Sequence, residues 1–298
     1  MMYRATIYKY LVDWVLLLLV GLFWGSSFIL MKKGLQVFSA QEVGALRIFS
    51  AAVLLLPWSL SWLRRLCWHH YRYLLLVGLV GSLMPVFLFA KAGTQLDSAI
   101  NGVLNALTPI CSLLVGRLCF QRPVFRREAW GSLLGLVGAA LLVLAGTENG
   151  VGRVNHYVLL PMLGCVCYGF NANFLKYYLQ DLSTHTIISV SFLLIGIVTG
   201  VMLFTQTAFL FKLNNVAGAY RAMGCVLTLG ALGSALAFIL FTQLVKRTSP
   251  VFASMATCIV PLVALGWGLL DGEVLLLGHY VGTGIILMGV YLVIKKRQ

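Results

Sequence analysis

The sequence predicts an all-α integral membrane protein with ten transmembrane helices, arranged as two inverted five-helix repeats around a central cavity. Three observations predict this fold: an apolar composition, ten apolar runs of membrane-spanning length, and residue matches between the two halves. Of the 298 residues, 60% are hydrophobic and only 10% are charged, whereas soluble domains carry about 25% charged residues. Such a chain cannot cover a water-facing surface, and ten spans leave no room for a soluble catalytic domain of ordinary size.

The ten spans are apolar runs between charged and turn residues. Each run is long enough to cross the bilayer, because a helix needs roughly 20 apolar residues to cross about 30 Å of hydrocarbon. Helices are expected because the runs are too long for barrel strands and a helix satisfies its own backbone hydrogen bonds in lipid. Short connectors after the third and eighth spans predict two tight hairpins. The expected spans are residues 12–31, 42–60, 73–92, 98–118, 128–146, 156–178, 185–205, 220–244, 250–270 and 277–294.

Topology explains the net charge of +14 better than nucleic-acid binding does, because the basic residues are scattered between apolar runs. With both termini in the cytoplasm, fifteen Lys and Arg residues fall on the cytoplasmic side and six on the other, with Arg47 inside the second span. This bias predicts cytoplasmic termini and an even number of spans. The six on the outer side are Lys32, Lys33, Lys91, Arg153, Lys212 and Arg221.

The two halves of the chain resemble each other at a slowly drifting offset. Trp24 matches Tyr168, 144 positions later, and Pro109 of the fourth span matches Pro261 of the ninth, 152 positions later. Five spans are an odd number, so the second half inserts upside down relative to the first. Such inverted repeats recur in transporters and place the substrate near the midplane between the halves. The predicted halves are residues 1–150 and 151–298.

Several motifs follow one another in a specific order along the chain. They are Phe23–Phe28, Glu42–Phe49, Asp97–Pro109 and Glu128–Gly131, with looser matches at Pro261 and Asp271–Glu273. This series resembles the EamA type of the drug/metabolite transporter superfamily. The resemblance implies ten helices, cytoplasmic termini, a cavity lined mainly by spans 1, 3, 4, 6, 8 and 9, and export or exchange of small metabolites such as amino acids. One departure is that Gln121-Arg122 replaces the family's frequent acid-Arg pair, and the acid survives only as Glu273 in the second half.

Polar side chains within the spans are the candidates for solute binding, because such groups tend to face the bundle interior or a wet pathway. Asn101, Asn105 and Thr108 share one face of the fourth span, and Pro109 frees a backbone carbonyl there. The aromatic residues matched between the halves lie mid-span, away from the interfacial belts, and are expected to wall the cavity. Hydrogen bonding between helices and plain packing are the alternatives. The substrate-binding candidates are Trp24, Ser27, Asn101, Asn105, Thr108, Tyr168, Asn171, Ser254 and Thr257.

Four further residues are assigned to gating or structure. The Arg47 guanidinium stays charged inside the second span, so we expect a carboxylate partner, with Glu42 as the candidate, and substrate contact as the alternative. Lys91 is expected to reach the headgroups from the outer end of the third span. Pro109 and Pro261 interrupt the fourth and ninth spans.

The acidic residues all lie at or beyond the predicted span ends. A proton-coupled carrier commonly uses a carboxylate inside a span, so a facilitator or exchanger driven by the solute gradient is expected. The seven cysteines and five histidines show no zinc or disulfide spacing, so no metal or cofactor is predicted, and His69 and His70 are expected to be solvated in a cytoplasmic loop. The acids are Asp13, Glu42, Asp97, Glu128, Glu148, Asp181, Asp271 and Glu273.

The sequence therefore predicts a transporter that exports or exchanges small polar or amphipathic metabolites, amino acids first, by alternating access. A nucleotide-sugar or phosphometabolite exchanger is the alternative, although it would need several basic residues around one phosphate pocket. An integral-membrane enzyme is disfavoured, since no cluster of acids or nucleophile with a base is present. A sensor or scaffold is disfavoured because it would not need two inverted halves. Short loops indicate a bacterial inner membrane. The expected partners are a solute and membrane lipid, and no nucleic acid. The chain is compatible with a monomeric transporter.

Overall fold

The computed structural model describes residues 2–63, 66–123, 126–144, 156–273 and 276–294. Within these ranges every regular element is a helix, and eight helical segments are long and apolar enough to cross a membrane. The all-α membrane fold is therefore confirmed. The eight segments are Leu11–Leu35, Ala40–Trp62, Trp68–Ala92, Ser98–Phe120, His156–Tyr178, Thr184–Thr205, Ala219–Arg247 and Pro250–Leu270.

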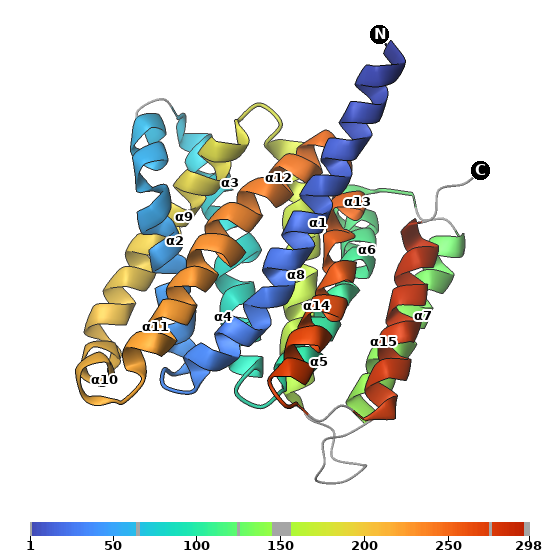
Figure 1. Ribbon diagram of the computed structural model, residues 1–298. Coiled ribbons are helices and arrows are strands. Elements are labelled where there is room, and N and C mark those ends of the chain that lie inside the picture. Colours follow the sequence, from blue (N-terminus) through green and yellow to red (C-terminus); the bar gives the residue numbers. More distant parts are fainter. Residues whose placement is uncertain (1, 64–65, 124–125, 145–155, 274–275, 295–298) are drawn as a thin grey trace.

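The helices form one bundle, with α7 and α15 side by side at its edge (Figure 1). In the first half the helices are α1 (Met2–Leu35), α2 (Ala40–Trp62), α3 (Trp68–Gly78), α4 (Met84–Ala92), α5 (Ser98–Leu104), α6 (Thr108–Phe120) and α7 (Arg126–Leu144). In the second half they are α8 (Leu159–Tyr178), α9 (Thr184–Thr205), α10 (Phe209–Asn215), α11 (Ala219–Thr228), α12 (Ala237–Arg247), α13 (Pro250–Ser254), α14 (Ala256–Leu270) and α15 (Leu277–Ile294).

The bundle has two distinct ends. Helix α1 begins and α15 ends at the same end, which we call the terminal end, whereas α10 and the last turn of α14 lie at the opposite end (Figure 1). This arrangement fits the even number of crossings that the charge bias predicts. The predicted boundary at 150/151 lies outside the described residues. So do several charged residues used in the sequence analysis: Arg64, Arg65, the side chain of Glu128, Glu148, Arg153, Lys295, Lys296 and Arg297.

Four of the long segments contain a break in regular α-helix. The segments Trp68–Ala92 and Ala219–Arg247 contain π-helical stretches, η2 (Leu79–Leu83) and η5 (Leu229–Leu236). The segment Ser98–Phe120 contains a 3₁₀ turn, η3 (Asn105–Leu107), and the segment Pro250–Leu270 is interrupted at Met255. Proline lacks a backbone donor and weakens the helix before it, which explains the break upstream of Pro109. Such irregular backbone is tolerated at membrane depth only where protein or a cavity surrounds it.

The first helix of each half packs against two helices of the other half. Helix α1 packs against α14 and α12, and α8 packs against α6 and α4, while α2 packs on α9 and α7 on α15. Helix α2 starts at the N-cap Ser39 and α9 at the N-cap Ser183, which lie 144 positions apart. In both cases the side chain accepts a backbone N–H and fixes the start of the helix. Helices of each half thus pack directly against helices of the other half.

Candidate functional site

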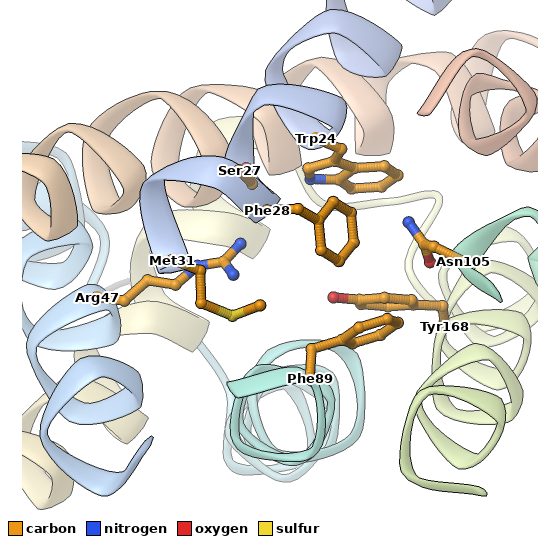
Figure 2. A pocket seen from close by; sticks show the side chains of 8 residues that line it. All are labelled: Trp24, Ser27, Phe28, Met31, Arg47, Phe89, Asn105 and Tyr168. Carbon is orange, nitrogen blue, oxygen red and sulfur yellow. The ribbon is translucent and has the colours of Figure 1, made fainter. Parts of the chain in front are cut away.

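A pocket lies in the middle of the bundle, between α1, α2, α4, α8 and η3 (Figure 2). Irregular backbone borders it on two sides, because η3 contributes one wall residue and η5 packs behind α2. Both features place it where the helices are least regular, as expected for a site buried in a membrane bundle. Its lining residues are Trp24, Ser27, Phe28, Met31, Arg47, Phe89, Asn105 and Tyr168.

Aromatic rings form most of the pocket wall. The Tyr168 ring stacks on Trp24, with ring centroids 5.9 Å apart, and on Phe89, with centroids 6.0 Å apart. Phe28 meets Phe89 edge to face at 5.7 Å. The indole N–H of Trp24 donates to the Gly233 carbonyl at 3.2 Å, so its polar group is satisfied behind the wall. These rings give the pocket a mainly aromatic wall, a surface that suits an apolar or cationic group of a solute.

Arg47 is the one cation among the lining residues. Its side chain is buried, with 6% of the residue exposed. Nε donates to Ser234 Oγ at 2.7 Å and Nη2 donates to the Gly233 carbonyl at 3.2 Å. Figure 2 shows the guanidinium directed into the pocket, toward the hydroxyl of Tyr168.

The expected ion pair between Arg47 and Glu42 is wrong. The Glu42 carboxylate instead accepts from Lys212 Nζ at 2.6 Å and from the Ser39 backbone N–H at 2.7 Å. The five-residue spacing separates the two side chains on α2, and Glu42 is already committed to capping that helix. Among the described residues, Arg47 therefore has no carboxylate partner, although a guanidinium has five donors.

Two glycines of η5 allow close approach of neighbouring helices, Gly230 toward α2, which carries Arg47, and Gly233 toward α1. A Cβ on Gly230 would meet Ser50 Oγ and lie 2.8 Å from the Arg47 carbonyl, and a Cβ on Gly233 would meet Ser27 Oγ. Side-chain atoms can rotate away, but the Arg47 carbonyl belongs to the backbone of α2. The close approach of α2 and η5 thus depends on the absence of a side chain at Gly230.

The Gly230→Ala variant is expected to destabilise the protein by about 1–3 kcal/mol, the usual cost of overpacking. The matched control is Gly224→Ala in the same membrane segment, because a Cβ there meets nothing within 4 Å and alanine favours helix by up to ~1 kcal/mol. Thermal unfolding of the two purified variants checks this. Equal melting temperatures would contradict the close-packing argument.

The structure brings some of the predicted site residues together and leaves others apart. Trp24, Ser27, Asn105 and Tyr168 line the pocket with Arg47. The other five substrate-binding candidates are buried elsewhere: Asn101, Thr108, Asn171, Ser254 and Thr257.

Local hydrogen bonds account for several of the candidates outside the pocket. Asn101 Nδ2 donates to the Phe89 carbonyl at 3.0 Å and so joins α5 to α4. Thr108 Oγ1 donates at 2.7 Å to the Asn105 carbonyl, the group freed by Pro109. The carbonyl that Pro109 frees is therefore satisfied by a neighbouring hydroxyl.

The ninth span behaves in a similar way. Ser254 Oγ donates to the Pro250 carbonyl and Thr257 Oγ1 to the Ser254 carbonyl, each at 2.7 Å. Both hydroxyls thus satisfy backbone groups of their own segment, upstream of Pro261. Lys91 is exposed, with its ammonium 6.0 Å from the Tyr157 ring centroid.

Four residues of the site were missed by the sequence reasoning. Phe28, Met31 and Phe89 line the pocket, and Ser234 holds Arg47. In the sequence the first three are ordinary apolar residues of a span. The glycine pair beside Ser234 was the available signal, because glycines inside a predicted helix indicate close approach of another backbone.

A buried acid closes the opposite end of the bundle across the two halves. Glu273 accepts from Lys32 Nζ at 2.8 Å, from the backbone N–H groups of Ser98 and Ala99 at 3.0 Å each, and from Ser98 Oγ. Partial burial opposes ionisation of Glu273, but the hydrogen bonds from Lys32 and Ser98 hold its pKa below its ordinary value. Glu273, the acid matched to the family pattern only in the second half, thus links α1 to the first turn of α5.

Further ion pairs join the halves at this end. Asp271 contacts Lys32 Nζ at 2.7 Å and also Lys33. Hydrogen bonds from Lys32 and then Lys33 lower the pKa of Asp271. Lys32 and Lys33, two of the six basic residues assigned to the outer side, therefore pair with acids of the other half. Lys212, another of the six, pairs in the same way with Glu42.

Other polar contacts close the terminal end. Asp13, buried in α1, pairs with Arg247 at the end of α12. Lys176 Nζ donates to the carbonyls of Lys246 and Thr248 at 2.9 Å each. The buried acids at both ends are thus partnered by cations, which fits their expected place at span ends.

Comparison with known proteins identifies the family. The EamA-like transporter family matches residues 14–144 and again residues 156–295. The chain belongs to the EamA-like transporter family. Two relatives are an uncharacterized transporter of Archaeoglobus fulgidus, 23% identical over 95% of this chain and 99% of that protein, and the uncharacterized inner membrane transporter YedA of Escherichia coli, 25% identical over 91% and 86%. A solved crystal structure shares the fold at a TM-score of 0.65 and 16% identity, covering 96% of each chain.

The family and the relatives named as transporters both point to a membrane transporter. The family matches two separate segments of the EamA-like chain, and these correspond closely to the two halves compared in the sequence. The predicted drug/metabolite transporter resemblance is confirmed at the level of the family.

Proposed function

We propose that this EamA-like transporter moves small amphipathic carboxylates, amino acids among them, by alternating access through the central pocket. The observation that carries the proposal is the buried Arg47, which faces the pocket and has no carboxylate partner in the described part of the chain. A buried guanidinium without a counter-ion is costly. A solute carboxylate would relieve that cost through charge-assisted, two-point hydrogen bonding.

The rest of the pocket favours an amphipathic solute. Rings of Trp24, Phe28, Phe89 and Tyr168 offer apolar faces for a hydrocarbon or aromatic side chain. They also offer negative π-faces to an ammonium group, which suits the other charge of an amino acid. Phosphate-bearing exchangers, the alternative, need several cations at one pocket, and Arg47 is the one cation among its lining residues. A single guanidinium therefore favours a carboxylate over a diphosphate.

Alternating access is proposed from the organisation of the halves. The exchanged contacts of α1 and α8, the paired N-caps and the doubled family match support two inverted repeats of residues 1–150 and 151–298. In this proposal α7 and α15 complete ten spans, both termini are cytoplasmic, and the membrane is a bacterial inner membrane, as for YedA. Polar contacts join the helices at both ends of the bundle, so opening either end requires breaking one set of them.

Counterflow in proteoliposomes tests the proposed solute class. Vesicles loaded with unlabelled phenylalanine or leucine are expected to accumulate the labelled amino acid, and vesicles loaded with the matching 2-oxo acid are expected to do so as well. The decarboxylated amines and a uridine-diphosphate sugar are expected to fail. Counterflow of the amine at the rate of the amino acid, or preferential exchange of the nucleotide sugar, would reject the carboxylate assignment.

A further inference from the structure

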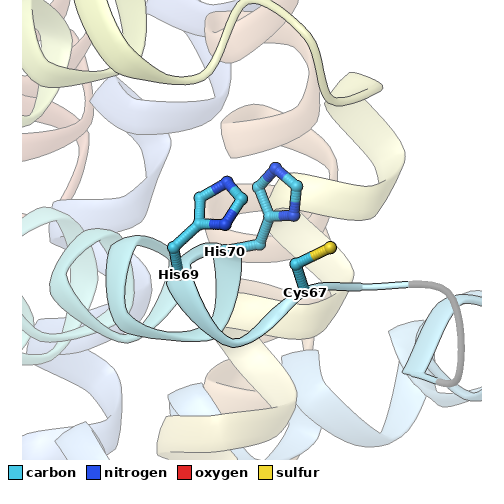
Figure 3. A group of neighbouring side chains, drawn as sticks. All are labelled: Cys67, His69 and His70. Atoms are coloured by element: carbon cyan, nitrogen blue, oxygen red, sulfur yellow. The ribbon is translucent and has the colours of Figure 1, made fainter.

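The first turn of α3 gathers three side chains of metal-binding type, far from the pocket. Cys67 is the N-cap of α3, and His69 and His70 lie in its first turn. One ligand atom from each residue lies within 4.8 Å of the others. Figure 3 shows the sulfur and the two imidazole rings projecting from the same side of the chain. The ring centroids of the two histidines are 3.9 Å apart.

His70 is oriented in the manner of a metal ligand. Its Nε2 lies 2.9 Å from Asp181 Oδ2 in the connection between α8 and α9, and its side chain is 14% exposed. Its Nδ1 is buried and has no hydrogen-bond partner among the described residues. A neutral imidazole that donates from Nε2 to a carboxylate keeps a lone pair on Nδ1. Metal-ligating histidines commonly have this carboxylate behind the ring, and it fixes the tautomer and the ring orientation.

We propose that Cys67, His69 and His70 bind one divalent transition-metal ion, with Zn²⁺ as the best match and water completing a tetrahedral set. One thiolate with two imidazoles is a borderline-soft donor set that favours Zn²⁺ over Mg²⁺ or Ca²⁺. Binding converts the Cys67 thiol to a thiolate and releases its proton to solvent. The ion would give the His70 Nδ1 lone pair the partner that it lacks.

The site would also couple the two halves at the terminal end. Helix α3 belongs to the first half, and Asp181 belongs to the second. A metal on Nδ1 leaves the His70 Nε2 proton to bond Asp181, so the bound ion reinforces that cross-half contact. Metal binding would therefore favour the conformation in which the terminal end is closed.

Cobalt spectroscopy of the purified, untagged full chain tests the site. Co²⁺ is expected to bind one per chain at micromolar concentration, with thiolate-to-metal charge-transfer and tetrahedral d–d absorption, and Zn²⁺ should displace it. Cys67→Ser should abolish the charge-transfer band, and His69→Gln or His70→Gln should weaken binding at least tenfold. Asp181→Asn should weaken it by about 10–100-fold, because that carboxylate positions a ligand.

Cys119→Ser is the matched control, because Cys119 is another exposed free thiol and its loss should leave the band unchanged. A band that survives Cys67→Ser, or one lost in Cys119→Ser, would overturn the assignment. So would Co²⁺ affinity that is the same in the two histidine variants as in the parent protein. Each variant is first checked by its melting temperature, so that misfolding is not read as loss of the site.

Discussion

Replacing Arg47 with glutamine is expected to abolish transport of carboxylate solutes while leaving the bundle folded. Losing the charged partner of a buried ion pair costs about 3–5 kcal/mol, which corresponds to a roughly 10²–10³-fold loss of affinity at 1.4 kcal/mol per tenfold. Arg47→Lys keeps the charge but loses the planar fork, so an intermediate loss is expected. Solute affinity is measured from the concentration dependence of counterflow.

The stability of the same variant separates a binding role from a structural one. Because Arg47 has no carboxylate partner among the described residues, Arg47→Gln strands no buried acid and should keep or raise the melting temperature. Arg247→Gln is the matched control, since it leaves the buried Asp13 carboxylate without its cation and should lower stability. Counterflow that persists in Arg47→Gln, or a melting temperature that falls as far as in Arg247→Gln, would refute the binding role.

The sequence was sufficient for the all-α membrane class because membrane burial imposes length and composition on each span separately. The apolar runs and the capping serines can be recognised without knowing how the helices pack. The irregular segments were harder to predict. Pro109 indicated a break in the fourth span, but η2 and η5 arise where helices approach one another, and that information is not local.

The site was only half predictable for the same reason. Trp24 and Tyr168 were found because large aromatic residues are unusual in mid-span positions, and Asn105 because an amide is costly there. Phe28 and Phe89 line the pocket through helix rotation alone, which an apolar run does not reveal. The partner of Arg47 was assigned to Glu42 from proximity in sequence, whereas the guanidinium is held by Ser234, 187 positions away. Hydrophobic periodicity does not encode such long-range pairings.

Glu273→Gln is expected to open the opposite end of the bundle. The carboxylate accepts hydrogen bonds from α1 and from the first turn of α5, whereas an amide would place an NH₂ group against some of these donors. Leaving such partly buried groups unsatisfied costs about 1–3 kcal/mol. The ratio of closed to open populations at this end should therefore fall roughly 10–100-fold. Labelling of a Ser27→Cys reporter in the pocket with an impermeant thiol reagent measures this, in a background without the exposed native cysteines.

Glu42→Gln is the control for loss of a buried negative charge at the same end, because its partner Lys212 lies outside the seam between α1, α5 and α14. Its labelling rate should stay near that of the parent.

The Glu273 carboxylate also predicts a pH dependence of labelling. The pKa of Glu273 is lowered in the closed form, so this stabilisation is fully present above the ordinary Glu pKa of about 4.3 and is lost as pH falls through the lowered value. Labelling of the parent should therefore be constant from about pH 5 to 8 and increase only below about pH 4, whereas Glu273→Gln should already be fast at neutral pH. Labelling that instead increases with pH, or that Glu273→Gln leaves at the parent rate, would show that this network does not hold the end closed.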